Sequence, residues 1–269
     1  MKGSATESGP ASAALDLESR FRNLRWWNLI VGLILAVQAV IIAVLQNGFS
    51  IPVVATWLNG PPGTAPETHK IGSFQLGWGV FAFLALSALA LLLIASPGIF
   101  GWYRRNLLQN RNYGRWIEYS VTSSLMILLI TMICGISDLA AMIAIFGANA
   151  SMILFGLLME KYEQPGKPNW LPFYFGCFAG VLPWLAVLIY VWSPGFGQRN
   201  PPAFVYGIIV SLFVFFNIFA VNMVLQYKKV GRWKDYLFGE KVYIILSLTA
   251  KALLAWQVFA SVLAGAVKG

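Results

Sequence analysis

The chain has 269 residues, of which 58% are hydrophobic and only 11% charged, and its formal net charge is +9. A soluble domain carries about 25% charged residues, so this composition excludes a soluble enzyme, a disordered chain and a secreted disulfide scaffold. The basic residues lie between long apolar runs. The expected partner of the positive charge is therefore an anionic membrane surface and not a nucleic acid. The sequence therefore predicts an all-α protein that crosses the bilayer several times.

Residues 1–25 are expected to form a cytoplasmic N-terminal tail, because they are rich in small residues and end in Arg20, Arg22 and Arg25. The following apolar run has about 20 residues, enough to cross a bilayer. No small-residue cleavage site follows it, so it is expected to be a retained helix and not a signal peptide. Residues 26–269 then form one membrane domain of seven helices, at about 26–46, 74–100, 113–137, 139–159, 172–192, 203–227 and 242–266.

The longest connection, about 47–73, follows the first helix. It contains two short stretches suited to extended structure around the turn-forming segment Asn59-Gly-Pro-Pro-Gly63. Such a pattern is typical of a β-hairpin. His69, the only histidine, lies in this connection, and a single histidine without partners does not make a metal site.

The distribution of the 19 basic residues predicts the orientation. Nearly all of them fall on the side of the N-terminus, whereas Lys70, Arg199 and Lys268 fall on the other side. Cytoplasmic loops carry the excess of Lys and Arg. The N-terminus is therefore expected in the cytoplasm, and the C-terminus and the 47–73 loop outside, in a multi-pass protein of the cell membrane.

Glu118 and Lys251 are the two ionisable residues expected well inside the seven runs. A charge at membrane depth is costly and usually faces a partner within the bundle. At about 1.5 Å per residue, Lys251 lies about 15 Å above Lys241 and Glu118 about 9 Å above Asn112. Helical side chains lean toward their own N-terminus, so the amine of Lys251 is expected near the level of Glu118.

A lysine amine in a dry pocket is a nucleophile for an aldehyde, and a nearby carboxylate stabilises the protonated Schiff base that results. Ser247 stands four residues before Lys251, on the same helix face. The third helix offers a face that grades from polar to apolar, as a polyene with one charged end requires; it consists of Glu118, Tyr119, Thr122, Ser123 and Met126.

Three segments of the chain resemble the heliorhodopsins, from about Leu24 onward: Arg115-Trp-Ile-Glu-Tyr-Ser120, Ile145-Phe-Gly-Ala-Asn-Ala-Ser-Met-Ile153 and Ser247-Leu-Thr-Ala-Lys251. The resemblance implies that Lys251 carries all-trans retinal and that Glu118 is the counterion. It places Ser247, Ser123 and Thr122 at the Schiff base. The retinal pocket that it implies is lined by Tyr119, Met126, Asn149, Met152 and Phe216.

The chain departs from this family in having no histidine in any expected span. Heliorhodopsins often carry histidines near the Schiff base in the first two helices. Whatever accepts the proton during the photocycle is then another group, either Glu118 or a water-linked polar cavity.

Two small-residue motifs permit close helix approach: Gly176…Gly180 in the fifth helix and Gly147…Ser151 in the fourth. They serve packing inside the bundle or a homodimer through helices four and five, which the resemblance favours. Tryptophans near span ends, Trp116 among them, are expected in the interface belts.

The first functional hypothesis is a retinal-binding photoreceptor, not an enzyme, with a slow photocycle and no ion pumping. The absence of pumping is expected because Leu129, eleven residues after Glu118, carries no proton, Ser247 is neutral, and no other Asp or Glu is expected within a span. A light-driven pump or channel is the second hypothesis. The third is a non-photoactive transporter or scaffold with a structural Glu118–Lys251 pair. A cytosolic signalling partner that reads the basic 228–241 loop is a further candidate.

Overall fold

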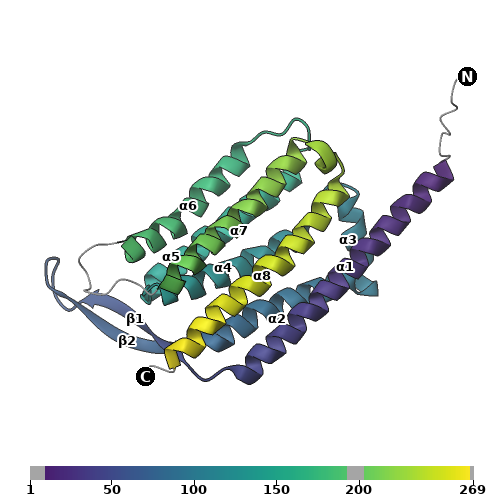
Figure 1. Cartoon of the computed structure of the whole chain (residues 1–269). Helices are drawn as coiled ribbons and strands as arrows, with labels where there is room; N and C mark the ends of the chain where they lie inside the picture. The colour runs from purple at the N-terminus through teal and green to yellow at the C-terminus, as the bar shows by residue number, and fades with distance from the viewer. Residues whose placement is uncertain (1–9, 193–202, 267–269) are drawn as a thin grey trace, which may run out of the picture.

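The computed structural model describes residues 10–192 and 203–266. Within these residues, seven helices are long and apolar enough to cross a membrane, and they lie side by side in one bundle (Figure 1). The expected seven-helix fold is thus confirmed. The spanning helices are α1 (Pro10–Leu45), α2 (Leu76–Ala95), α4 (Tyr113–Ile133), α5 (Leu139–Tyr162), α6 (Leu171–Trp192), α7 (Ala203–Tyr227) and α8 (Tyr236–Ala266).

Polar residues in the connections cap two of the helices. Asn112 Oδ1 accepts from the backbone N–H of Arg115 at 3.1 Å, and Asp138 Oδ1 accepts from that of Ala141 at 3.1 Å. Each cap satisfies a backbone donor at a helix start that has no partner within the helix. The two caps fix where α4 and α5 begin.

The structure moves several expected helix boundaries. The described part of the tail is helical, because α1 already begins at Pro10; the division between residues 1–25 and 26–269 stays a prediction. The second expected run is divided after Ala95. Ser96 is extended, and Pro97, which lacks a backbone donor, begins the short helix α3 (Pro97–Leu107). A 3-10 turn, η1 (Gly231–Lys234), precedes α8.

The connection between α1 and α2 forms two antiparallel strands, β1 (Ser50–Leu58) and β2 (Pro66–Gln75). They project from the end of the bundle opposite the N-terminus of α1 (Figure 1). The backbone N–H of Val54 donates to Ser137 O at 2.9 Å, which ties the hairpin to the start of α5. His69 stacks on Trp57 with ring centroids 4.4 Å apart.

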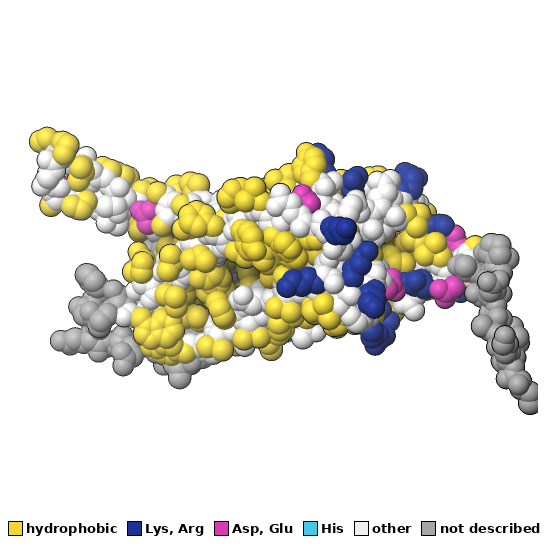
Figure 2. All heavy atoms as spheres, turned by 90° about the horizontal axis from the view of Figure 1, so that it is seen from above, with side chains coloured by type: hydrophobic (Ala, Val, Ile, Leu, Met, Phe, Trp, Pro, Cys, Tyr) yellow, Lys and Arg dark blue, Asp and Glu magenta, His cyan; other side chains and the backbone are white. Residues whose placement is uncertain are grey.

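The side chains are distributed as a membrane protein requires. A buried apolar core runs through the bundle, while large apolar side chains also cover the outside of the helices. Figure 2 shows the lysines and arginines gathered toward the end that carries the N-terminus of α1. The orientation of the termini in the membrane stays a prediction that rests on this asymmetry.

Candidate functional site

Glu118 on α4 and Lys251 on α8 meet inside the bundle. Lys251 Nζ donates to Glu118 Oε1 at 2.5 Å, and the side chains are 8% and 7% exposed. The depth estimate from the sequence therefore predicted a contact that the structure contains.

Two further hydroxyls donate to the same oxygen of Glu118. Thr122 Oγ1 lies 2.8 Å from Oε1 and Ser87 Oγ lies 2.7 Å from it. Ser87, fully buried on α2, was missed by the sequence analysis. The available signal was that it is the only hydroxyl residue in α2. These donors fix the carboxylate toward Lys251.

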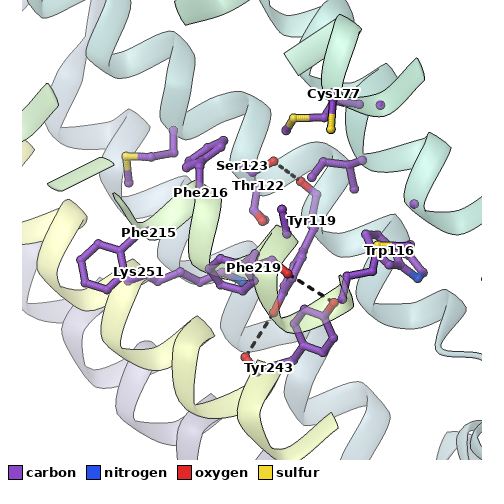
Figure 3. A pocket seen from close by; sticks show the side chains of 18 of the residues that line it. Trp116, Tyr119, Thr122, Ser123, Cys177, Phe215, Phe216, Phe219, Tyr243 and Lys251 are labelled. Carbon is purple, nitrogen blue, oxygen red and sulfur yellow. Dashed lines mark hydrogen bonds between the residues drawn. The ribbon is translucent and has the colours of Figure 1, made fainter. Parts of the chain in front are cut away.

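A large, mostly apolar cavity begins at Lys251 and extends between α4, α5, α6 and α7. It encloses about 1000 Å³ of space not filled by atoms, part of it open to the outside. Figure 3 shows Lys251 reaching into it from α8. Of the residues expected at the site, those that line it are Tyr119, Thr122, Ser123, Met126, Met152, Phe216 and Lys251.

Three expected site residues are not among those that line this cavity: Glu118, Asn149 and Ser247. Asn149 is buried behind its wall, where its Nδ2 donates to Ser123 Oγ at 2.9 Å and to Ser124 Oγ at 3.0 Å. These bonds join α5 to α4. Ser247, together with Glu118, lines a second, smaller cavity. Its Oγ is buried and has no hydrogen-bond partner among the described residues.

Trp116 was expected in the aromatic belt at the membrane interface, but it lies inside the bundle. It is only 6% exposed and lines the large cavity. A Cβ added to Gly156 of α5 would lie 2.4 Å from its ring, so the absence of a side chain at Gly156 makes room for it. The signal in the sequence was its spacing of three from Tyr119 and seven from Ser123, which places all three on one helix face.

The expectation that no other Asp or Glu lies within a span is wrong, because Glu160 and Glu240 lie inside spanning helices, close to their ends. Arg115 of α4 pairs with both Glu160 of α5 and Glu240 of α8, and these side chains are 5%, 2% and 1% exposed. The sequence analysis missed this cluster because the apolar runs stop short of both carboxylates. In the structure both helices continue past the apolar residues, and the two acids pair with the arginine there.

The Gly176…Gly180 motif of α6 packs against α5 of the same chain. A Cβ at Gly180 would lie 2.4 Å from Met152 Sδ, and one at Gly176 would lie 3.3 Å from Met152 O. The motif thus packs α6 on α5. Gly147 differs, because its added Cβ would meet nothing within 4 Å, and it is exposed together with Ser151.

Comparison with known proteins identifies the relatives of this chain. Residues 24–263 match the family model of the heliorhodopsins, while no curated protein matches. A cyanorhodopsin from the cyanobacterium Tolypothrix sp. is 17% identical over 92% of this chain and 97% of its own, with a TM-score of 0.63.

Two further solved structures are similar. The proton-pumping rhodopsin of the marine alga Acetabularia acetabulum is 17% identical over 91% of this chain and 96% of its own, with a TM-score of 0.66. A light-driven proton pump from Leptosphaeria maculans is 12% identical over 90% and 94%, with a TM-score of 0.62. At these identities the likeness shows the fold alone.

Proposed function

Because this chain belongs to the heliorhodopsin family, we propose that it is a light sensor in which Lys251 binds all-trans retinal as a Schiff base and Glu118 is the counterion. Family membership makes it a rhodopsin-type membrane protein and implies a retinal chromophore. The observation that carries the residue assignment is the 2.5 Å contact between Lys251 Nζ and Glu118 Oε1 at the edge of an apolar cavity.

The residues around Lys251 fit retinal, which has one reactive polar end and an apolar polyene. Hydrogen-bonding groups gather at the Glu118 end, where Ser87 and Thr122 hold the carboxylate. Aromatic and aliphatic side chains form most of the remaining wall, including Trp116 and Phe216. When bound, retinal would supply the absorption of visible light.

Each remaining site residue has a distinct role in this proposal. The Tyr119 ring centroid lies 4.9 Å from Lys251 Nζ, and an aromatic face stabilises a cationic nitrogen. Met126, Met152 and Phe216 would contact the polyene. Asn149 would act indirectly, by holding Ser123 in the wall. Ser247 would face the Schiff base from the smaller cavity.

A receptor with a slow photocycle is favoured over a pump. A proton pump needs proton-carrying groups on both sides of the nitrogen. Among the described residues, the buried carboxylates are those of Glu118, Glu160 and Glu240. All three lie at the level of Lys251 or toward the end of the bundle that carries the N-terminus of α1 (Figure 1). Beyond Lys251, α8 continues with the buried apolar residues Leu254, Val258 and Phe259. The described residues in the half of the bundle beyond Lys251 include no buried carboxylate that could carry a proton onward.

The alternative of a light-driven pump remains testable, since two of the similar solved structures are described as proton pumps. Illuminated liposomes that contain the protein should show no sustained change in external pH. A sustained change that a protonophore abolishes would establish pumping and contradict the sensor proposal.

An absorption spectrum of the purified protein with added retinal tests the proposed chromophore directly. We expect a visible band that hydroxylamine bleaches, because hydroxylamine cleaves a Schiff base. The absence of any visible band would favour the third hypothesis, in which the Glu118–Lys251 pair is only structural.

The proposed setting is the cell membrane, with the N-terminus in the cytoplasm and the C-terminus outside. A homodimer through α5 and α6 is proposed as well. A Cβ added to Gly147 would meet nothing within 4 Å, and Gly147 and Ser151 are both exposed, which leaves room for a second helix. The downstream partner would be a cytosolic protein that reads the basic segment 228–241.

A further inference from the structure

The Arg115 cluster has an unbalanced charge. One guanidinium pairs with two carboxylates, those of Glu160 and Glu240, and all three side chains are almost fully buried. The fully ionised cluster therefore carries one excess negative charge. Because a buried net charge is costly, such a cluster has capacity for one proton.

Neutral groups complete the coordination of the two carboxylates. Asn112 donates from its backbone N–H to Glu160 Oε2 at 2.7 Å and from its Nδ2 to Glu240 Oε2 at 2.6 Å. Gln226 Nε2 lies 3.4 Å from Glu240 Oε1, and Tyr236 OH lies 3.3 Å from Glu160 Oε1. No second cation pairs with either acid among the described side chains. The excess charge is thus stabilised by hydrogen bonds but not neutralised.

The smaller cavity connects this cluster to Glu118. Its wall includes Glu118 and Ser247 toward the retinal site, and Asn112, Arg115 and Glu240 toward the cluster. It offers about 30 Å³ of space to the centres of water molecules, and about 10–15 Å³ is enough for one. The cavity therefore has room for about two water molecules, and Glu118 and Glu240 both line it.

Glu240 is the acid in direct contact with this cavity, whereas Glu160 is not among its wall residues. Tyr103 of α3 also lines the cavity. Burial and the negative charge of Glu240 hold the pKa of the Tyr103 hydroxyl well above its usual value. Tyr103 therefore stays protonated and does not compete with Glu240 for a proton.

On the basis of the retinal attachment proposed above, we propose that Glu240 stores the proton that leaves Lys251 Nζ after light absorption. The N–H bond breaks and its electron pair stays on the nitrogen, while Glu118 Oε1, 2.5 Å away, takes the proton. Glu118 passes a proton through water in the smaller cavity to a Glu240 carboxylate oxygen and returns to its ionised form. The cluster then changes from one net negative charge to none.

Light-minus-dark infrared spectra of the retinal-loaded protein test this storage. We expect illumination to produce a carboxylic acid C=O band that shifts in frequency in Glu240→Asp and disappears in Glu240→Gln. Glu163→Gln is the control, because Glu163 accepts from the backbone of Asn169 outside the cluster; it should keep the band. The shift in Glu240→Asp keeps the test decisive if Glu240→Gln does not fold.

A second readout needs no retinal. In an infrared pH titration of the retinal-free protein, one buried carboxylate should take up a proton in the parent chain and in Glu163→Gln, but not in Glu240→Gln. A titration identical in all three would overturn the storage role.

The outcomes separate this inference from the function on which it rests. A parent protein without a visible band would overturn both. A visible, light-responsive protein whose infrared band is unchanged in both Glu240 variants would overturn only the storage role. Release of one proton per protein into the medium, followed with a pH dye, would also overturn it.

Discussion

At the scale of single residues, three donors converge on one oxygen of Glu118, and they come from α2, α4 and α8. The sequence predicted the contribution of Lys251, because a charge at membrane depth requires a partner. Ser87 is marked in the sequence as the only hydroxyl residue of α2, but its contact with Glu118 could not be predicted, because that contact depends on which helix lies beside α4. Composition and spacing identify the polar and charged residues that need a partner within the membrane. Which groups become their partners depends on which helices lie next to one another.

Replacement of Lys251 is the first prediction at this scale. Lys251→Ala should give a folded protein without any visible band after addition of retinal, because it removes the amine that contacts Glu118 in the cavity. Lys241→Ala is the matched control, since Lys241 lies on the same helix with its Nζ 4.9 Å from the Trp27 ring centroid; it should keep the colour. A covalent retinal adduct in denatured Lys251→Ala would refute the assignment.

The counterion gives the second prediction. Glu118→Gln removes the negative charge beside the nitrogen, so the positive charge of the chromophore should spread further along the polyene. Any protonated form should then absorb at longer wavelength, and in an alkaline titration its visible band should disappear at a lower pH than in the parent. Glu67→Gln, in the exposed hairpin, should change neither property. An unchanged spectrum and titration in Glu118→Gln would exclude Glu118 as the counterion.

At the scale of elements, the apolar runs predicted every spanning helix but not where each one ends. Glu160 and Glu240 look like loop residues because they are charged, yet each lies inside a helix, where Arg115 provides a buried partner. Trp116 was placed at an interface for a similar reason, since its nearness to a helix end is visible in the sequence and its contact with Gly156 is not. Interactions between helices thus account for the errors.

Close packing of α4 on α5 yields the third prediction. Gly156→Ala places a methyl 2.4 Å from the Trp116 ring, so the ring must shift toward the cavity. Such overpacking costs about 1–3 kcal/mol, and we expect a lower bleaching temperature and weaker retinal binding. Gly147→Ala on the same helix meets nothing within 4 Å and should match the parent or exceed it slightly. Equal bleaching temperatures for the two variants would show that Trp116 does not depend on this contact.

At the scale of the whole molecule, charge is polarised along the bundle axis. The basic side chains gather at the end that carries the N-terminus of α1, while the β1–β2 hairpin projects at the other end. Because basic residues are retained on the cytoplasmic side, the hairpin should face the outside. Single cysteines introduced at exposed positions can report this, one at Thr64 in the hairpin and one at Lys234 in the turn before α8.

An impermeant thiol reagent applied to intact cells should label Thr64→Cys, and it should label Lys234→Cys only after the membrane is opened. The parent chain serves as the blank for its own cysteines. Burial raises the pKa of the Cys134 thiol, near the hairpin end, to about 11, so little reactive thiolate forms there at neutral pH. Labelling of Lys234→Cys but not of Thr64→Cys in intact cells would reverse the orientation. The carboxylates Glu118, Glu160 and Glu240 would then lie toward the outside, and a cytosolic partner could no longer read the basic segment 228–241.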